Sequence, residues 1–302
     1  MTTAIATATT TTATDVVVVE TLADYSAILD SARHGGLTVG VVLTMGALHE
    51  GHASLIRRAA AECDVVAVSV FVNPTQFAEA GDLVNYPRTL DTDLEVAGAA
   101  GASVVFAPSV PEMYPGWPTA PATTVTVRGL GDRWEGKSRP GHFDGVATVV
   151  VKLLSASGRC RTYFGEKDFQ QLAIVRRVAR DLSLPVEVIG CATVREPDGL
   201  AMSSRNVRLG VEERRAAACL SRALTVGADA VAAGSDRAGV EAAMVDVVRD
   251  QPLVELDYAV LVDADDLEPA FDTSPDRPLR LLIAAAVGPV RLIDNHDPRR
   301  ML

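Results

Sequence analysis

Apolar residues gather in short runs along the chain, and amphipathic segments lie between these runs. Five runs rich in β-branched residues predict strands buried on both faces, at 37–46, 63–73, 101–109, 160–168 and 184–194. Segments typical of helices lie between several of them, at 52–62, 90–101 and 169–182. Strands that alternate with helices indicate βαβ units, so the pattern predicts an α/β fold with a mostly parallel sheet.

The pattern changes after about Val194. A polar loop leads into Ala- and Arg-rich helical stretches over roughly 211–249, and three apolar runs then predict a second, smaller sheet, at 254–264, 279–288 and 290–295. We therefore predict a domain boundary near residue 193, with an α/β domain over 15–193 and a smaller α+β domain over 194–302. Residues 1–14 are rich in Thr and Ala and are predicted to form a disordered tail.

Composition narrows the classes of function. A net charge of −11 and a pI of about 4.9 argue against a broad basic surface for nucleic acid, so any phosphate must be bound locally. The four cysteines form no CxxC pair, which disfavours a zinc knuckle or a disulfide framework and indicates reduced thiols in the cytoplasm. No uncharged apolar stretch approaches the ~20 residues that cross a bilayer, so no membrane partner is expected.

The first candidate for chemistry is the stretch TMGALHEGH (44–52), where a strand is predicted to end and a helix to begin near Gly51 or His52. Gly46 would let the backbone turn closely around a ligand, and the helix start would offer N–H groups and a positive dipole end to an anion. His49 and His52 would add donors for triphosphate oxygens. The alternative is structural, because paired histidines at a helix start can also cap or pack.

An amide follows another predicted strand. In FVNPTQF (71–77) the strand runs into a turn that presents Gln76. An amide at this place suits a small hydroxy acid, because it can donate to a carboxylate or hydroxyl and accept from a hydroxyl. Taken alone, the segment is better explained as a simple Asn-Pro turn.

Charged residues follow the strand in YFGEKDFQQL (163–172). Lys167 can reach a phosphate, and Asp168 can bind a ribose hydroxyl or cap the helix. A solvated helix start explains both charges as well. Gln170 and Gln171 are adjacent on the predicted helix and point in different directions, so only one of them need face a pocket.

Hydroxyls and a guanidinium lie in a loop at the proposed domain boundary. Ser203, Ser204 and Arg205 could wrap a pyrophosphate, and a loop at a domain junction can move with the second domain. In isolation, a Ser-rich linker with a solvated Arg is the better interpretation.

Two further segments remain open from the sequence. RPGHFDGV (139–146) contributes Arg139 and His142, whose role the sequence does not define. YPRTLDTD (86–93) offers Asp91 and Asp93, carboxylates that could hold magnesium directly or through water. A solvated helix start explains these aspartates equally well, so no metal ligand is assigned.

Together these segments resemble a known family. The stretch 44–52 is similar to the HxGH signature of the nucleotidyltransferase superfamily, and the five segments after it resemble, in order and approximate spacing, those of the pantoate:β-alanine ligase family. The match spans nearly the whole chain after the tail. The fold expected on this basis is a Rossmann-like, parallel-sheet N-terminal domain with a smaller α+β C-terminal domain.

The resemblance also implies an activity and its site residues. The activity is ATP-dependent condensation of pantoate with β-alanine through pantoyl adenylate, with release of pyrophosphate and AMP and with Mg2+ accompanying ATP. The implied catalytic residues are His49, His52 and Lys167. The implied ATP-binding residues are Met45, Gly46, His49, His52, Gly165, Lys167, Asp168, Val194, Met202, Ser203, Ser204 and Arg205. Pantoate is expected at Gln76 and Gln171, with Asn73 as a weaker member, and a homodimer is implied by the resemblance alone.

Two residues depart from the family pattern. Leu43 stands where proline is common, which could loosen the turn, and Thr75 stands where methionine is common, which could alter the pantoate pocket.

Two other functions remain as alternatives. A simple nucleotidyltransferase would release an adenylylated or cytidylylated product instead of passing an acyl group to an amine. A non-catalytic protein of the same fold is the second rival, and the retained histidines, Lys167 and the SSR loop argue against it.

Overall fold

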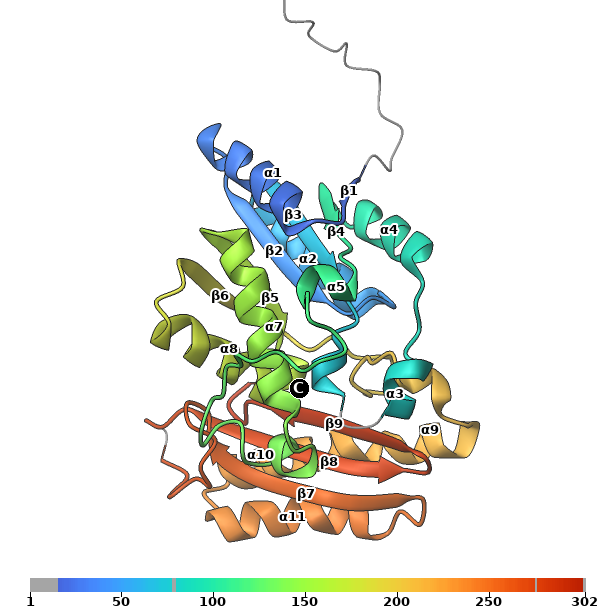
Figure 1. Ribbon diagram of the computed structural model, residues 1–302. Helices are drawn as coiled ribbons and strands as arrows, with labels where there is room; N and C mark the ends of the chain where they lie inside the picture. Colours follow the sequence, from blue (N-terminus) through green and yellow to red (C-terminus); the bar gives the residue numbers. More distant parts are fainter. Residues whose placement is uncertain (1–15, 78–79, 275, 301–302) are drawn as a thin grey trace, which may run out of the picture.

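The computed structural model describes residues 16–77, 80–274 and 276–300. It contains a six-stranded parallel sheet flanked by helices and a three-stranded antiparallel sheet with helices on one side (Figure 1). The predicted fold class is confirmed. Over the described ranges, no helix is long and apolar enough to cross a membrane. The predicted tail, 1–14, lies outside the described residues, and the boundary near residue 193 stays a prediction.

The large sheet has the strand order β1-β4-β3-β2-β5-β6. Its strands are β1 (Val17–Val19), β2 (Val39–Thr44), β3 (Val65–Val70), β4 (Val104–Phe106), β5 (Cys160–Gly165) and β6 (Val186–Cys191). The five predicted runs form β2 to β6. β1, a short edge strand that pairs with β4, was not predicted.

Helices cover both faces of this sheet. Alternate residues of β2 show the division, because Val41 packs in a core with residues of α1 (Leu22–His34), α7 (His142–Ser157) and α8 (Phe169–Asp181). Val42 packs instead with residues of α2 (Glu50–Glu62) and α4 (Leu90–Ala99). The shorter helices are η1 (Pro74–Gln76), α3 (Ala80–Asn85), α5 (Val110–Met113), α6 (Glu135–Ser138), η2 (Glu166–Asp168) and η3 (Asn206–Arg208). Apolar side chains on both faces explain why the strands read as continuous apolar runs.

The C-terminal part begins with helices and ends with a meander. Its elements are α9 (Val211–Ala217), α10 (Cys219–Ala232), α11 (Arg237–Arg249), β7 (Val254–Asp263), β8 (Leu279–Val287) and β9 (Val290–His296). Leu281 and Ile283 of β8 pack with α10 and α11, whereas their neighbour Leu282 packs into the core of the large sheet's helices. The small sheet therefore buries both faces, and β9 lies nearest the N-terminal part (Figure 1).

The strand order reverses at β2. The chain proceeds from β2 to β3 on one side, and β5 later pairs with the other side of β2. In open parallel sheets, ligands bind at the carboxyl ends of the strands beside such a reversal. The segments that follow Thr44 and Gly165 therefore meet at the expected binding edge.

Candidate active site

A cavity of about 330 Å³ lies at this edge, beyond the ends of β2 and β5. Its walls come from the β2–α2 loop, the turn after β3, the turn before α8 and the loop after β6. The predicted residues that line it are Met45, His49, His52, Gln76, Gly165, Lys167, Asp168, Gln171, Val194, Met202, Ser203, Ser204 and Arg205. Gly46 and Asn73 complete the predicted set but are not among its lining residues.

The two histidines are bound to the start of α2. The helix begins at Glu50, slightly before the predicted start, because His49 is its N-cap. His49 Nδ1 accepts the Gly51 N–H at 3.1 Å, and His52 Nδ1 accepts the His49 N–H at 3.4 Å. Gly51 is required here, since a Cβ at this position would lie 2.8 Å from His49 Cε1. The histidines therefore cap the helix and also line the cavity.

This arrangement determines the protonation state and the tautomer in which the two imidazoles face a ligand. Burial lowers the pKa of His52 to about 3, with His49 as the next cause, and burial followed by the Lys167 charge lowers the pKa of His49. Both rings are therefore neutral near pH 7. Because each Nδ1 accepts a backbone N–H, the ring proton of each lies on Nε2. The pair presents two N–H donors at a helix N-terminus, which suits an anion.

A buried carboxylate shapes the loop that leads to these histidines. Asp93 is 1% exposed and accepts the N–H groups of Ala47 and Leu48 at 3.1 and 2.7 Å. Gly46 has φ +86°, and a Cβ there would lie 2.9 Å from Asp93 Oδ2. The glycine is thus needed to fold the loop against the carboxylate. Asp93 fits neither interpretation that the sequence left open, a magnesium ligand or a solvated helix start, whereas Asp91 is exposed.

Gln76 is oriented by residues behind the cavity wall. Asn73 Nδ2 donates to Gln76 Oε1 at 2.9 Å and to the Gly145 carbonyl at 3.2 Å. Its Oδ1 accepts from Tyr114 and from Thr75, both at 2.9 Å. Asn73 is 1% exposed, so the structure places it as a support for Gln76 rather than on the cavity surface. The Thr75 hydroxyl joins this support, which is the consequence of one departure from the family pattern.

Arg139 and His142 receive a structural role that the sequence did not define. His142 Nδ1 donates to the Gln76 carbonyl at 2.9 Å, and Arg139 Nη1 donates to His142 Nε2 at 3.0 Å. Burial, and then the Arg139 charge, lower the pKa of His142 to about 4. The ring is therefore neutral and fastens the backbone of Gln76 to the start of α7. Both residues also line the cavity.

The turn before α8 carries the cavity's lysine. Lys167 Nζ lies 3.5 Å from Asp168 Oδ1, and Asp168 makes no capping bond to α8, so the cap interpretation is not observed. Partial desolvation of the half-exposed Asp168 carboxyl opposes its ionisation, but the charges of Lys167 and Arg205 outweigh this effect and lower its pKa. Gln171 lines the cavity, whereas Gln170 is buried and donates to the carbonyls of residues 130 and 133.

Ion pairs and hydrogen bonds support the loop that carries Ser203, Ser204 and Arg205. Arg214 pairs with Glu196 at 2.7 Å and with Asp198 at 2.6 Å. Asn206 Nδ2 donates to Glu196 Oε1 at 2.8 Å and to the Ala201 carbonyl at 3.1 Å. The sequence did not predict these contacts, because the residues involved are of types common on protein surfaces. They meet only because α9 packs against the loop.

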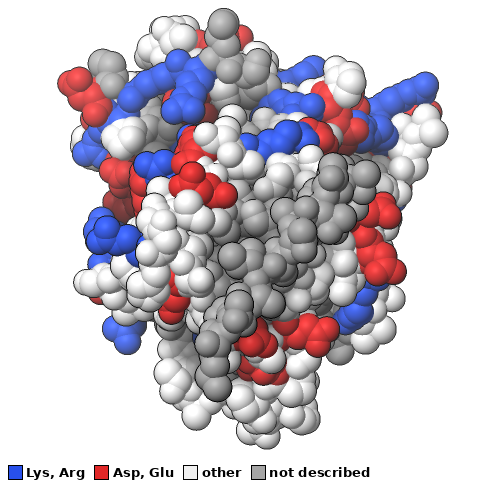
Figure 2. All heavy atoms as spheres, turned by 90° about the horizontal axis from the view of Figure 1, so that it is seen from above, with Lys and Arg blue, Asp and Glu red and all other residues white. Residues whose placement is uncertain are grey.

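On the face drawn in Figure 2, which is seen from above Figure 1, Lys and Arg side chains are interspersed with Asp and Glu, so no broad basic surface lies there. Among the described residues, no group of three or more His, Cys, Asp and Glu side chains could hold a metal ion. Of the residues that line the cavity, Asp168 alone carries a carboxylate, and it lies beside Lys167.

Comparison with known proteins gives one family. The family model described as Pantoate-beta-alanine ligase matches residues 17–297. A pantothenate synthetase from Rubrobacter xylanophilus is 53% identical over 268 residues, which are 87% of this chain and 92% of that protein. The crystal structure of pantothenate synthetase from Thermus thermophilus is 44% identical with a TM-score of 0.86, over 94% of this chain and all of that one. A pantoate-beta-alanine ligase from Francisella tularensis, solved with β,γ ATP and β-alanine, is 31% identical with a TM-score of 0.75, over 95% of this chain and 99% of that one.

Proposed function

The chain belongs to the pantoate–β-alanine ligase family and joins pantoate to β-alanine, and we propose that it does so in two steps through pantoyl adenylate. The observation that carries the proposal is the composition of one cavity of about 330 Å³. Amides suited to a hydroxy acid lie there with neutral imidazole donors and with the cations of Lys167 and Arg205.

In the first step, a carboxylate oxygen of pantoate attacks the α-phosphorus of ATP, and pyrophosphate leaves. Gln76 and Gln171 are proposed to hold the two ends of pantoate. Asn73 donates to Gln76 Oε1, and Gln76 Nε2 donates one hydrogen to Met45 Sδ at 3.0 Å, so its second amide hydrogen is available to an acceptor in the cavity. The chain's task is to align carboxylate and phosphorus, since no covalent nucleophile of the protein is needed.

We propose that preformed donors stabilise the negative charge that develops on the phosphates. These are Nε2–H of His49 and His52, the ammonium of Lys167, and the SSR loop of residues 203–205. Asp168 is assigned to the ribose hydroxyls. Mg2+ would enter on ATP, held by phosphate oxygens and water, and would neutralise part of the triphosphate charge.

In the second step, the amine of β-alanine attacks the acyl carbon of the adenylate, a proton is released, and AMP leaves as pantothenate forms. The part of the chain after residue 193 is proposed to act as a lid that keeps water from the mixed anhydride. We also propose a homodimer, from the family alone. A cytoplasmic location is proposed as well, and the four buried, unpaired cysteines support it.

Product stoichiometry tests this function. With ATP, magnesium, pantoate and β-alanine, the protein should form AMP and pantothenate in equal amounts. Omission of β-alanine should reduce AMP release to at most one equivalent per site, because the adenylate stays bound. Continuous AMP release without β-alanine would contradict the proposal.

A further inference from the structure

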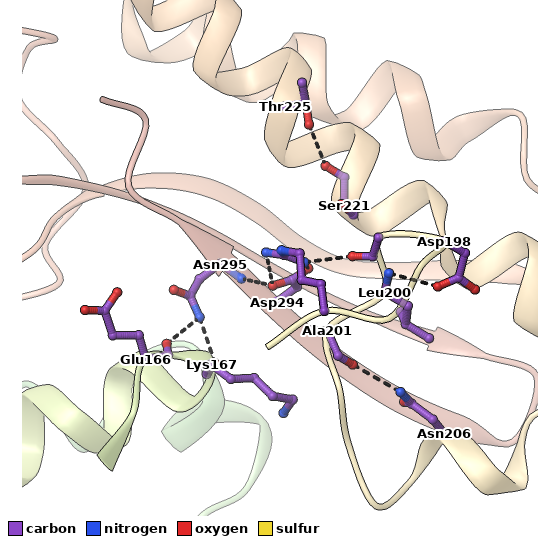
Figure 3. A network of polar contacts seen from close by, with 12 residues as sticks. Glu166, Lys167, Asp198, Leu200, Ala201, Asn206, Ser221, Thr225, Asp294 and Asn295 are labelled. Carbon is purple, nitrogen blue, oxygen red and sulfur yellow. Dashed lines mark hydrogen bonds and ion pairs between the residues drawn. The ribbon is translucent and has the colours of Figure 1, made fainter. Parts of the chain in front are cut away.

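Strand β9 borders the active site, although no predicted site residue lies on it. Asp294 and Asn295 line a small cavity whose other walls include Lys167, Asp168 and Arg205, which also line the main cavity. Both β9 side chains are buried. Figure 3 shows them between the turn that carries Lys167 and the chain near Leu200 and Ala201.

Asn295 uses its whole amide group in this contact. Its Nδ2 donates to the carbonyls of Glu166 and Lys167 at 2.9 and 2.7 Å, and its Oδ1 accepts from Arg280 Nε at 2.7 Å (Figure 3 shows the two donated bonds). Both hydrogens and the oxygen therefore have partners, which fixes the orientation of the amide. The two carbonyls belong to η2, the three-residue turn that carries Lys167.

Arg280 makes further contacts with the same turn. Its Nη2 donates to Glu166 Oε2 at 3.1 Å, and its guanidinium lies 4.1 Å from the centre of the Phe169 ring. The turn has no side-chain cap of its own. Side chains of the C-terminal sheet therefore hold both the backbone and the Glu166 side chain of this turn.

Asp294, the preceding residue of β9, holds the other phosphate segment. Its carboxylate accepts from Arg195 Nη1 and Nη2 at 2.6 and 3.0 Å, and Arg195 Nη1 also donates to the Gly199 carbonyl at 3.0 Å. Arg195 and Gly199 precede the loop with residues 203–205. Two consecutive residues of one strand thus hold the two segments that carry the proposed phosphate ligands.

We propose that Asn295 is a positioning residue of the first half-reaction, whose side-chain amide fixes the η2 backbone so that Lys167 meets the triphosphate. The inference rests on the proposed function. A lysine stabilises developing charge fully only where its backbone is held, because a displacement of about 1 Å at a site can cost about 100-fold in rate. The role is indirect, since Asn295 acts through the turn and not on the substrate.

The variant Asn295→Asp tests this role with almost no change of shape. It keeps an acceptor for Arg280 but loses both donors and sets a carboxylate oxygen against two carbonyls. Adenylate formation, measured as pantoate-dependent exchange of labelled pyrophosphate into ATP, should fall about 30-fold. In a Lys167→Ala background the same change should cost less than about threefold, because the residue through which it acts is gone. An equal 30-fold loss in both backgrounds would show a general structural effect and overturn the inference.

Asn206→Asp is the matched control, because Asn206 is also a buried amide that donates to the chain of a phosphate segment. Its effect should persist in full in the Lys167→Ala background. If it vanishes there too, the coupling is not specific to Asn295 and the inference fails. Should Asn295→Asp not fold, Asn295→Ala should show a smaller loss that again depends on Lys167.

The exchange rate of the unaltered protein distinguishes a failure of this inference from a failure of the proposed function on which it rests. If it shows no pantoate-dependent exchange, the proposed function fails. If it exchanges normally and Asn295→Asp does so at the same rate, the inference about β9 alone fails.

Discussion

The imidazole rings of His49 and His52 lie 4.2 Å apart between centroids, and each has committed its Nδ1 to a backbone N–H at the start of α2. The pair is therefore structural and chemical at once. The same bonds that cap the helix select the tautomer that presents Nε2–H to the cavity.

One substitution at His49 separates these roles. His49→Asn keeps an acceptor near the position of Nδ1, at an N-cap where asparagine is favoured, but removes the distal donor. We expect stability close to that of the parent and adenylate formation reduced about 100-fold, while attack of β-alanine on preformed pantoyl adenylate slows far less, because the triphosphate is present only in the first step. Rapid-quench assays of the two half-reactions measure this.

The control is His34→Asn, at an exposed histidine at the end of α1, which should behave as the parent. Equal damage to both half-reactions in His49→Asn would indicate a collapsed pocket instead of a lost donor. His52→Ala should show the same imbalance between the steps.

Lys167→Ala should reduce adenylate formation at least ~100-fold, as the loss of one preorganised charge-stabilising donor does. The fold should persist, because the side chain, although only 18% exposed, lines the cavity and is absent from the hydrophobic core. Lys137→Ala, at an exposed lysine of α6, is the matched control and should be silent. Near-normal single-turnover adenylation by purified Lys167→Ala protein would remove the role assigned to this lysine.

Asp93→Asn tests whether this carboxylate is a loop anchor. Ala47 and Leu48 donate to different oxygens of Asp93, so the NH2 group of asparagine would face the N–H of one of them, and the unfolding free energy should fall by about 1–3 kcal/mol. Adenylation should fall about tenfold because the loop before His49 shifts. Urea unfolding and exchange assays measure both, with exposed Asp91→Asn as the control. A raised magnesium requirement without loss of stability would point to a metal ligand instead.

His142 should make stability depend on pH. Its folded-state pKa of about 4 lies below the ordinary 6.5, so the unfolded chain binds this proton more tightly. Its contribution to stability is therefore present above pH 6.5 and is lost as pH falls toward 4, by about 2 kcal/mol between pH 7 and pH 5. Urea unfolding of His142→Gln should show a decrease over this interval that is smaller by this amount. Identical decreases in parent and variant would contradict the assigned environment, and His34→Gln should match the parent.

Local patterns predicted much of this molecule, and long-range contacts account for the rest. The strands β2 to β6 were predictable because burial on both faces leaves a continuous apolar run in the sequence. His49, Lys167 and Gln76 could be placed at one cavity because each lies at or just after the end of such a run, where a parallel sheet binds its ligands, whereas their roles came from the family resemblance.

The residues that hold this site in place left no comparable signal. Asp93 lies in a segment typical of a solvated helix start, and its burial depends on a loop 45 residues away. Asn295 contacts a turn 128 residues earlier in the chain, and no spacing in the sequence records that contact. The resemblance implied that Asn73 is a weaker member of the pantoate site, whereas its side chain is 1% exposed and supports Gln76 from behind the cavity wall.

Exchange of labelled pyrophosphate into ATP tests the central claim most directly. The account predicts exchange with magnesium, ATP and pantoate in the absence of β-alanine, because attack at the α-phosphorus is reversible while the adenylate stays bound. It predicts no exchange without pantoate, and equal amounts of pantothenate and AMP once β-alanine is added. Exchange that needs no pantoate, or AMP release that ignores β-alanine, would contradict the ligase mechanism.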